Sequence, residues 1–179
     1  MRNRAGGVTL ALVSLVLHAC ENATRFYAPP VQRPALDGFR PYRVVRIVDV
    51  SDDVDPYFVS DITGMSGGSW RWTRQRPTVR VVLPKTNDLH YLIDFTIYDR
   101  AFRDTGPLTI SYFVNDRLLD TIRYEMAGLH HFEKAVPAEW MQPGMDATVA
   151  AEVDKPWIDP ETGEKLGILL FRIGLSQNP

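Results

Sequence analysis

The residues with the clearest binding chemistry lie in one short stretch, GGSWRWTR, at positions 67–74. Trp70 and Trp72 lie two positions apart, so on a strand their rings share one face while Arg71 takes the other. Exposed aromatic rings stack on sugar rings, and a nearby Arg74 would orient the sugar hydroxyl groups. We therefore take Trp70, Arg71, Trp72 and Arg74 as candidate ligand-binding residues. The alternative is that both tryptophans pack in the core, as large aromatic side chains usually do.

Two aromatic residues elsewhere extend this set. Tyr57 is followed by Phe58, and their rings could add to an aromatic platform. Trp157 lies in the polar segment DKPWIDPETGEK, where we expect an exposed ring, or a ring that caps one end of the domain. Tyr57 and Trp157 therefore join the candidate ligand-binding residues.

One segment, His130-His131-Phe132-Glu133, has a superficial resemblance to metal-ligand spacing. Adjacent histidines on a strand point to opposite faces, so only His131 and Glu133 could share a metal ion. That pair needs a third ligand from elsewhere, and the helical His-Glu-x-x-His pattern of zinc hydrolases is absent. We predict no metal site here, with edge or turn histidines instead.

An acidic loop is formed by Asp52, Asp53 and Asp55. Calcium binds several carboxylate and carbonyl oxygens, but this spacing matches no defined calcium loop. We predict a solvated acidic turn and no cofactor, with structural calcium as the alternative.

Catalytic patterns have little support in the sequence. The Gly-x-Ser-x-Gly elbow of serine hydrolases is absent, and no pair of acidic residues stands out for glycoside cleavage. We therefore expect a domain that is not an enzyme.

Composition limits the class of partner and the number of domains. The chain has 179 residues, a formal net charge of −2 and one cysteine. This length suits one domain, and a single cysteine allows no disulfide within the chain. A mildly acidic protein has no electrostatic footprint for nucleic acid, so we expect no nucleic-acid partner.

The amino-terminal segment has the pattern of an export signal. Arg2 and Arg4 precede an apolar run at 8–17, which is about half the length needed to span a bilayer. The sequence Leu17-His18-Ala19-Cys20 then resembles the bacterial lipobox.

The lipobox resemblance implies that residues 1–19 are removed and that Cys20 is acylated on sulfur. The mature chain would be attached to a membrane of the bacterial cell envelope, and we favour the outer membrane because Glu21, not aspartate, follows the cysteine. The alternative is a plain secreted protein with a free Cys20. Four prolines at 29, 30, 34 and 41 predict that residues 20–41 form a semi-rigid tether.

Residues 42–177 are rich in short β-branched and aromatic runs. These runs lie at 42–50, 78–84, 91–99, 108–114, 118–124, 147–153 and 167–175. Turn-forming residues separate them, and no long helical period is present, although PAEWMQ at 137–142 could form one helical turn. We predict an all-β fold, an antiparallel β-sandwich of about eight strands.

The most clearly defined unit is a hairpin, with Asn115-Asp116 as a two-residue turn. Leu118, Ile122 and Tyr124 should continue one face of the return strand. Asp120 interrupts that face, which predicts either an edge position or a shift in register.

Several short motifs follow one another in a recognisable order between residues 56 and 175. They are Arg71-Trp72-Thr73, Val114-Asn115, Val136-Pro137-Ala138 and Leu166-Gly167. This order resembles the galactose-binding-like jelly-roll modules attached to bacterial surface-glycan enzymes, although Asp116 replaces the usual glycine of the hairpin turn. The resemblance implies a jelly-roll sandwich and a non-catalytic module that binds carbohydrate. The alternative function is a structural or assembly partner within an envelope protein complex.

Overall fold

The computed structural model describes residues 46–50, 54–83, 87–142 and 144–177, all within one compact unit. The predicted leader, Cys20, the tether to residue 41, Asp52 and Asp53 lie outside the described residues. Within the described ranges, no helix has both the length and the apolar character that a membrane crossing requires.

The described residues form eleven strands, one α-helix and two 3-10 helices. In chain order they are β1 (Ile47–Asp49), η1 (Asp55–Tyr57), β2 (Phe58–Ser66), β3 (Arg71–Val82), β4 (Leu89–Ile97), α1 (Asp99–Thr105), β5 (Leu108–Val114), β6 (Arg117–Tyr124), β7 (Gly128–Ala135), η2 (Ala138–Trp140), β8 (Asp146–Val153), β9 (Trp157–Ile158), β10 (Lys165–Leu166) and β11 (Leu169–Gln177).

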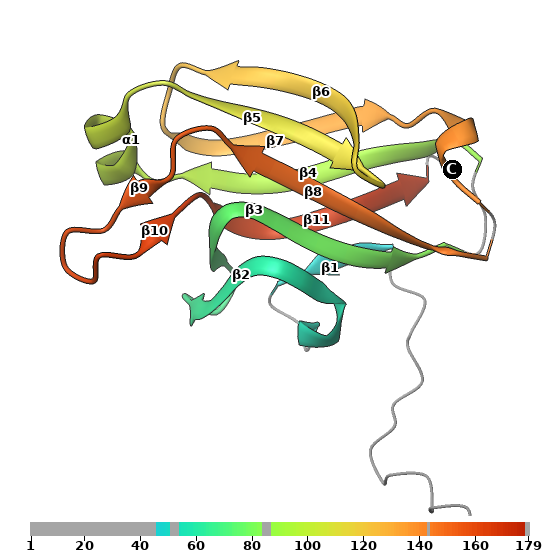
Figure 1. Ribbon diagram of the computed structural model, residues 1–179, viewed down its shortest axis with the longest axis horizontal. Helices are drawn as coiled ribbons and strands as arrows, with labels where there is room; N and C mark the ends of the chain where they lie inside the picture. The colour runs from blue at the N-terminus through green and yellow to red at the C-terminus, as the bar shows by residue number, and fades with distance from the viewer. Residues whose placement is uncertain (1–45, 51–53, 84–86, 143, 178–179) are drawn as a thin grey trace, which may run out of the picture. The chain divides into compact units, whose positions relative to one another are not determined.

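The strands form one curled antiparallel sheet with the order β6-β5-β8-β3-β11-β4-β7 (Figure 1). β1 pairs with β11, β2 pairs with β3, and β9 and β10 form a separate hairpin. The curl places β5 and β8 opposite β4 and β7, with the apolar core between these two layers. The predicted all-β antiparallel sandwich is confirmed, with eleven strands instead of about eight.

The elements that the sequence analysis missed are short or polar. β2 and β7 each pair with one neighbour only, so their sequences carry Ser, Asp, Gly and His in place of a β-branched run. α1 has seven residues and no side-chain cap, which is too short for a recognisable helical period. The predicted helical turn near residue 138 is confirmed as η2.

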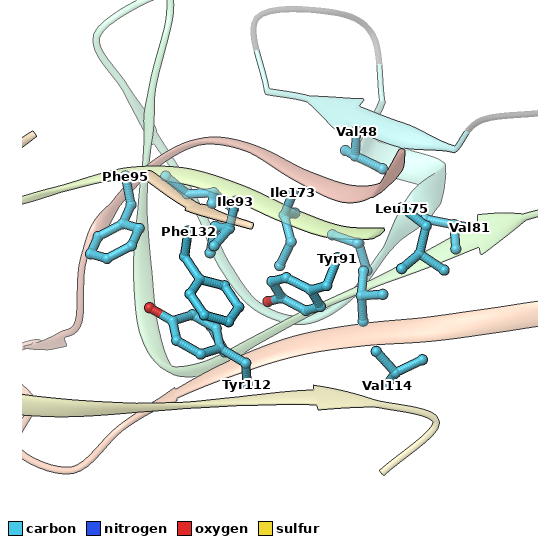
Figure 2. Close-up of a cluster of buried hydrophobic side chains, with 14 of the residues drawn as sticks. Val48, Val81, Tyr91, Ile93, Phe95, Tyr112, Val114, Phe132, Ile173 and Leu175 are labelled. Carbon is cyan, nitrogen blue, oxygen red and sulfur yellow. The ribbon is translucent and has the colours of Figure 1, made fainter. Parts of the chain in front are cut away.

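Aromatic side chains fill the space between the layers (Figure 2). The Tyr112 ring of β5 stacks on the Phe132 ring of β7, with 3.9 Å between centroids and 6° between planes. Tyr91 of β4 contacts both rings edge-on, and its hydroxyl donates a 3.0 Å hydrogen bond to the Ala150 carbonyl of β8. Burial raises the pKa of Tyr91, so this hydroxyl keeps its proton and remains a donor.

β3 belongs to both layers and joins them. It pairs with β11 at Arg71 and Trp72, and with β8 from Thr78 onward. Between these two regions the buried Thr73 hydroxyl donates to the Ile168 carbonyl at 3.1 Å and accepts from the Ile168 amide at 3.0 Å.

The backbone at residue 167 lies so close to the backbone of β3 that residue 167 must be glycine. A Cβ atom on Gly167 would lie 2.2 Å from the Arg74 carbonyl oxygen, inside van der Waals contact. The glycine of the Leu166-Gly167 step therefore allows β3 to contact the segment that leads into β11. We call this contact, between residues 73–74 and 167–168, the joint.

The open seam of the sandwich lies between β6 and β7, the two ends of the sheet. Lys134 of β7 bonds Asp120 of β6 at 2.7 Å, and this hydrogen bond lowers the pKa of the Asp120 carboxyl. Asp120, which interrupts the apolar pattern of β6, therefore forms a salt bridge that closes the seam. Nearby, the Tyr124 ring contacts the His130 ring with centroids 4.7 Å apart.

The predicted hairpin turn is confirmed, since Asn115 and Asp116 have φ angles of 48° and 60°. Both alternatives for Asp120 hold, because β6 is an edge strand and its register shifts between Asp120 and Leu118. The expected place of Leu118 on the apolar face is wrong, because this shift leaves its side chain exposed.

Replacing Tyr91 with phenylalanine tests the bond between the layers. The change keeps the ring and removes this one hydrogen bond to the Ala150 carbonyl, so we expect a loss of about 0.5–1.5 kcal/mol in the free energy of unfolding. Urea unfolding followed by fluorescence measures the loss. Tyr98→Phe is the matched control, because the Tyr98 side chain is exposed; equal effects of the two changes would contradict this role.

Candidate functional site

Three of the tryptophans meet one another, and one of them, Trp157, begins β9. The strands β9 and β10 lie with α1 at one end of the sandwich (Figure 1). Trp72 is stacked on Trp157 at 6.3 Å, while Trp70 meets Trp72 edge-on at 6.4 Å. Tyr98, which the sequence analysis did not single out, meets Trp72 edge-on at 5.6 Å. We call Trp70, Trp72, Tyr98 and Trp157 the end cluster.

The end cluster differs from a free aromatic platform, because Trp157 is buried and Trp72 is partly buried against the same small core. Only 6% of Trp157 is exposed, because the ring packs with Ala101 and Leu166 in a small second core. Its indole N–H donates to the Asp104 carboxylate at 2.7 Å. The expected exposure of Trp157 is therefore wrong, and the alternative of a ring that caps one end of the domain describes it better.

Tyr57 and Arg71 do not join this cluster. Tyr57 is buried in the main core. Arg71 forms a 2.7 Å ion pair with Asp55, and its guanidinium lies 5.0 Å from the centre of the Phe58 ring. The prediction that Tyr57 and Arg71 are open to a ligand is wrong, because side chains that the chain itself supplies surround both. Asp55, one of the acidic-loop residues, is the partner of Arg71.

Arg74 lies in a cleft of about 420 Å³ on the outer side of β3. We call this cleft the β3 cleft; its lining residues are Asp61, Ile62, Thr63, Gly64, Arg74 and Glu164. Within the part of the chain that the structure describes, the exposed Arg74 guanidinium makes no ion pair or hydrogen bond. Its N–H groups are thus available to donate hydrogen bonds to a ligand.

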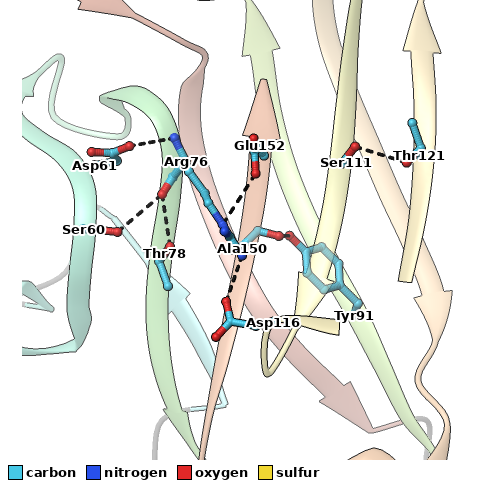
Figure 3. Close-up of polar contacts among 10 residues, drawn as sticks. All are labelled: Ser60, Asp61, Arg76, Thr78, Tyr91, Ser111, Asp116, Thr121, Ala150 and Glu152. Atoms are coloured by element: carbon cyan, nitrogen blue, oxygen red, sulfur yellow. Dashed lines mark hydrogen bonds and ion pairs between the residues drawn. The ribbon is translucent and has the colours of Figure 1, made fainter. Parts of the chain in front are cut away.

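Asp61 enters the cleft through an irregularity in β2. The register with β3 shifts on both sides of Asp61, whose φ of 59° lies in the left-handed region. Aspartate tolerates this conformation better than most residues, and such bulges re-aim side chains. The Asp61 carboxylate accepts a 2.7 Å bond from the Arg76 amide (Figure 3).

Glu164 reaches the cleft from the turn between β9 and β10. Asp159 orders this turn by accepting bonds from the Thr162 hydroxyl at 2.8 Å and the Glu161 amide at 3.1 Å. These bonds lower the pKa of the Asp159 carboxyl. Asp61 and Glu164 were not predicted, because nothing local in the sequence indicates that they meet Arg74.

The β3 cleft is connected to the end cluster. The Thr63 hydroxyl donates to the Trp72 carbonyl at 3.0 Å. In the turn that joins β2 to β3, the Trp70 ring lies against Gly67, where an added Cβ would approach the ring to 2.3 Å. One hairpin therefore carries both a wall of the cleft and the half-buried Trp70 ring.

A second polar cluster occupies the outer face of the opposite layer. His131 bonds Asp94 at 2.5 Å, Arg172 bonds the other oxygen of Asp94, and Glu133 lies 3.2 Å from His90. His131 and Glu133, the pair considered for a metal, instead approach each other at 3.6 Å. Among the described residues, no group of three or more metal-binding side chains is arranged around a common point.

The Asp94 carboxyl has a perturbed pKa. Partial burial works to raise it, but the hydrogen bonds from His131 and Arg172 outweigh burial and hold the pKa below its ordinary value. This carboxylate therefore stays ionised in the folded protein at pH values where it would begin to protonate in the unfolded chain.

No protein-family model and no curated protein matches the sequence. Among solved structures, an acetyl xylan esterase from the rumen bacterium Butyrivibrio proteoclasticus is similar over 76% of this chain and 34% of its own, at 12% identity and a TM-score of 0.43. A family GH115 4-O-methyl-α-glucuronidase with specificity for decorated arabinogalactans is similar over 78% of this chain and 18% of its own, at 8% identity and a TM-score of 0.45. The chain thus spans about a third and a fifth of these two proteins.

One expectation from the sequence needs correction after these comparisons. Both similar structures belong to enzymes, which contradicts the expectation that this chain is not an enzyme. We therefore withdraw the description of the domain as non-catalytic.

The Asp94 network predicts a defined pH dependence of stability. Because its folded pKa is lowered, its contribution is complete above the ordinary aspartate pKa of about 3.9 and is lost as pH falls through the folded pKa. We expect Asp94→Asn to unfold at lower urea concentration than wild type at pH 6, with a difference that shrinks toward pH 3. Glu139→Gln, an exposed carboxylate on η2, is the control. A difference that stays constant with pH would contradict the network's role.

Proposed function

We propose that this domain binds carbohydrate in the β3 cleft. The observation that carries the proposal is the Arg74 guanidinium, which has no partner among the described residues and lies in a cleft also lined by Asp61 and Glu164. A sugar hydroxyl both donates and accepts hydrogen bonds, so it satisfies a guanidinium donor and a carboxylate acceptor together. The volume of the cleft lies within the range of roughly 300–1,000 Å³ that is typical of ligand sites.

The surroundings of the cleft support a sugar over a fully charged ligand. One arginine and two acidic residues leave a small negative balance, which disfavours a strongly anionic ligand. The half-buried Trp70 ring on the same hairpin supplies an aromatic surface for the apolar face of a sugar ring.

A second candidate function is supported by one separate observation. Met126 and Leu129, beside and on the edge strand β7, are 71% and 73% exposed. Exposed apolar side chains near a sheet edge are suited to a protein partner, such as another component of an envelope complex.

Arg74→Ala tests carbohydrate binding directly. The full-length chain, made with Cys20→Ala so that no lipid contributes, is applied to an array of neutral and acidic glycans, and the hits are measured by calorimetry. Loss of charged hydrogen bonds should weaken binding by about 10- to 100-fold. Arg80→Ala is the matched control, because Arg80 lies further along the same strand and is not among the residues of the cleft. The absence of any glycan ligand, or equal losses in both variants, would refute the proposal.

We also propose that the chain is held on a bacterial envelope membrane, with the outer membrane favoured, by lipid on Cys20. The support is the sequence alone, namely a basic start, a short apolar run and the lipobox-like Leu17-His18-Ala19-Cys20. Removal of residues 1–19 takes Arg2 and Arg4 away, which leaves 18 basic against 22 acidic residues and a net charge of −4. Such a chain has no general attraction to anionic lipid, so attachment would depend on the acyl chains.

Cys20→Ala is expected to move the protein from the membrane fraction to the soluble fraction. Cell fractionation with immunoblotting measures the change, and metabolic labelling with a palmitate analogue should mark the wild type only. Cys20→Ser gives a second variant that also lacks the thiol. Retention of either variant in the membranes would show that attachment does not depend on Cys20.

A further inference from the structure

We infer that the β3 cleft is one end of an elongated site that takes a linear oligosaccharide, not a single terminal sugar. This inference rests on the proposed carbohydrate function. The site continues from the cleft across the outer face of β3, β8, β5 and β6. Its basis is a row of four polar side chains, one from each strand, which we call the transverse row: Arg76, Glu152, Ser111 and Thr121 (Figure 3).

The strand register brings these four residues into line. Ser111 of β5 lies opposite Glu152 of β8 on one side and opposite Thr121 of β6 on the other. On β3, the Arg76 guanidinium reaches Glu152 at 3.7 Å. Opposed residues in an antiparallel sheet point to the same face, so the row crosses three strand spacings, about 14 Å. That length exceeds the span of one sugar ring.

The row is continuous with the cleft through a single residue. The Asp61 carboxylate, which lines the cleft, accepts a hydrogen bond from the Arg76 amide, and the Arg76 side chain begins the row. Figure 3 shows Asp61, Arg76 and Glu152 following one another across the strands. A chain bound at Arg74 would therefore meet a line of further hydrogen-bonding groups.

The chemistry of the row suits hydroxyl groups. It offers a guanidinium donor, a carboxylate acceptor and two hydroxyls that act as either, with Ser111 and Thr121 3.1 Å apart. The side chains of Arg76 and Glu152 are 38% and 39% exposed, so they remain accessible despite their mutual contact. Exposed polar groups of this kind exchange hydrogen bonds with solvent for hydrogen bonds with sugar hydroxyls when a sugar binds.

One half-buried aromatic ring lies beside the row on the same face. Phe113 of β5 lies opposite the buried Ala150 of β8. The Arg76 guanidinium lies 4.5 Å from the centre of the half-buried Phe113 ring and also bonds Asp116 at 2.8 Å. A polar row beside a half-buried aromatic ring suits a sugar, whose rings have hydroxyl edges and C–H faces. Because Arg76 is held by several partners, little ordering is needed when such a chain binds.

The test compares affinity with chain length. The probes are linear gluco-, xylo-, manno- and galacturono-oligosaccharides, each as the di-, tetra- and hexasaccharide, measured by calorimetry on the full-length Cys20→Ala chain. We expect the hexasaccharide of a binding series to bind at least tenfold more tightly than the disaccharide, because only the longer chain reaches the transverse row.

Variants separate the row from the cleft. The double change Ser111→Ala and Thr121→Ala should weaken hexasaccharide binding about tenfold, as expected for two hydrogen bonds, and leave disaccharide binding unchanged. Arg74→Ala should weaken both lengths. Thr96→Ala, on the opposite layer, is the control and should change neither. Circular dichroism and thermal unfolding confirm that each variant is folded.

The outcomes distinguish this inference from the function on which it rests. If affinity is independent of chain length, or the double variant weakens both lengths equally, the elongated site is wrong and carbohydrate binding in the cleft stands. If none of the saccharides binds at any length, both are overturned. Capture of an envelope protein that is lost in the Ser111/Thr121 variant would identify this face as a protein interface and also overturn the inference.

Discussion

The architecture depends on the joint between β3 and the start of β11, where one strand serves both layers of the sandwich. The Thr73 hydroxyl satisfies both the amide and the carbonyl of Ile168, and Gly167 lets the two backbones approach. A buried hydroxyl without such partners would cost free energy, so these two hydrogen bonds favour the observed arrangement of the joint. The curl of the sheet, and hence the core between its layers, follows from it.

The same joint determines which side chains of β3 reach solvent. Arg71 precedes it and lies against Asp55 and Phe58, whereas Arg74 follows it and lines the β3 cleft with no ion pair or hydrogen bond to any residue that the structure describes. Three positions along one strand therefore separate an arginine held in an ion pair from an arginine that lines the cleft. The β9–β10 hairpin ends at Leu166, directly before the joint, so the joint also brings Glu164 to the cleft.

Local sequence predicted the candidate site only in part. Arg74 and the Trp70–Trp72 pair were recognisable because their types and spacing lie within one short segment. Tyr57 and Arg71 were wrongly included, since their burial depends on segments that pack against them. Asp61 and Glu164 went unrecognised because one enters through a shift in register and the other through a distant hairpin. The transverse row is a property of four strands in register, which no local pattern contains.

The sequence by itself determined the class of fold and the position of the hairpin turn. Alternating β-branched and aromatic runs can bury one face only as strands, and Asn115-Asp116 can adopt the left-handed angles that a tight hairpin requires. Only the tertiary structure decided that Asp120 pairs with Lys134 across the seam, that Trp157 packs in a second core, and which carboxylates face Arg74. The physical reason is range: strand formation depends on neighbours along the chain, whereas burial and ion pairing depend on segments that meet only after the sheet has curled.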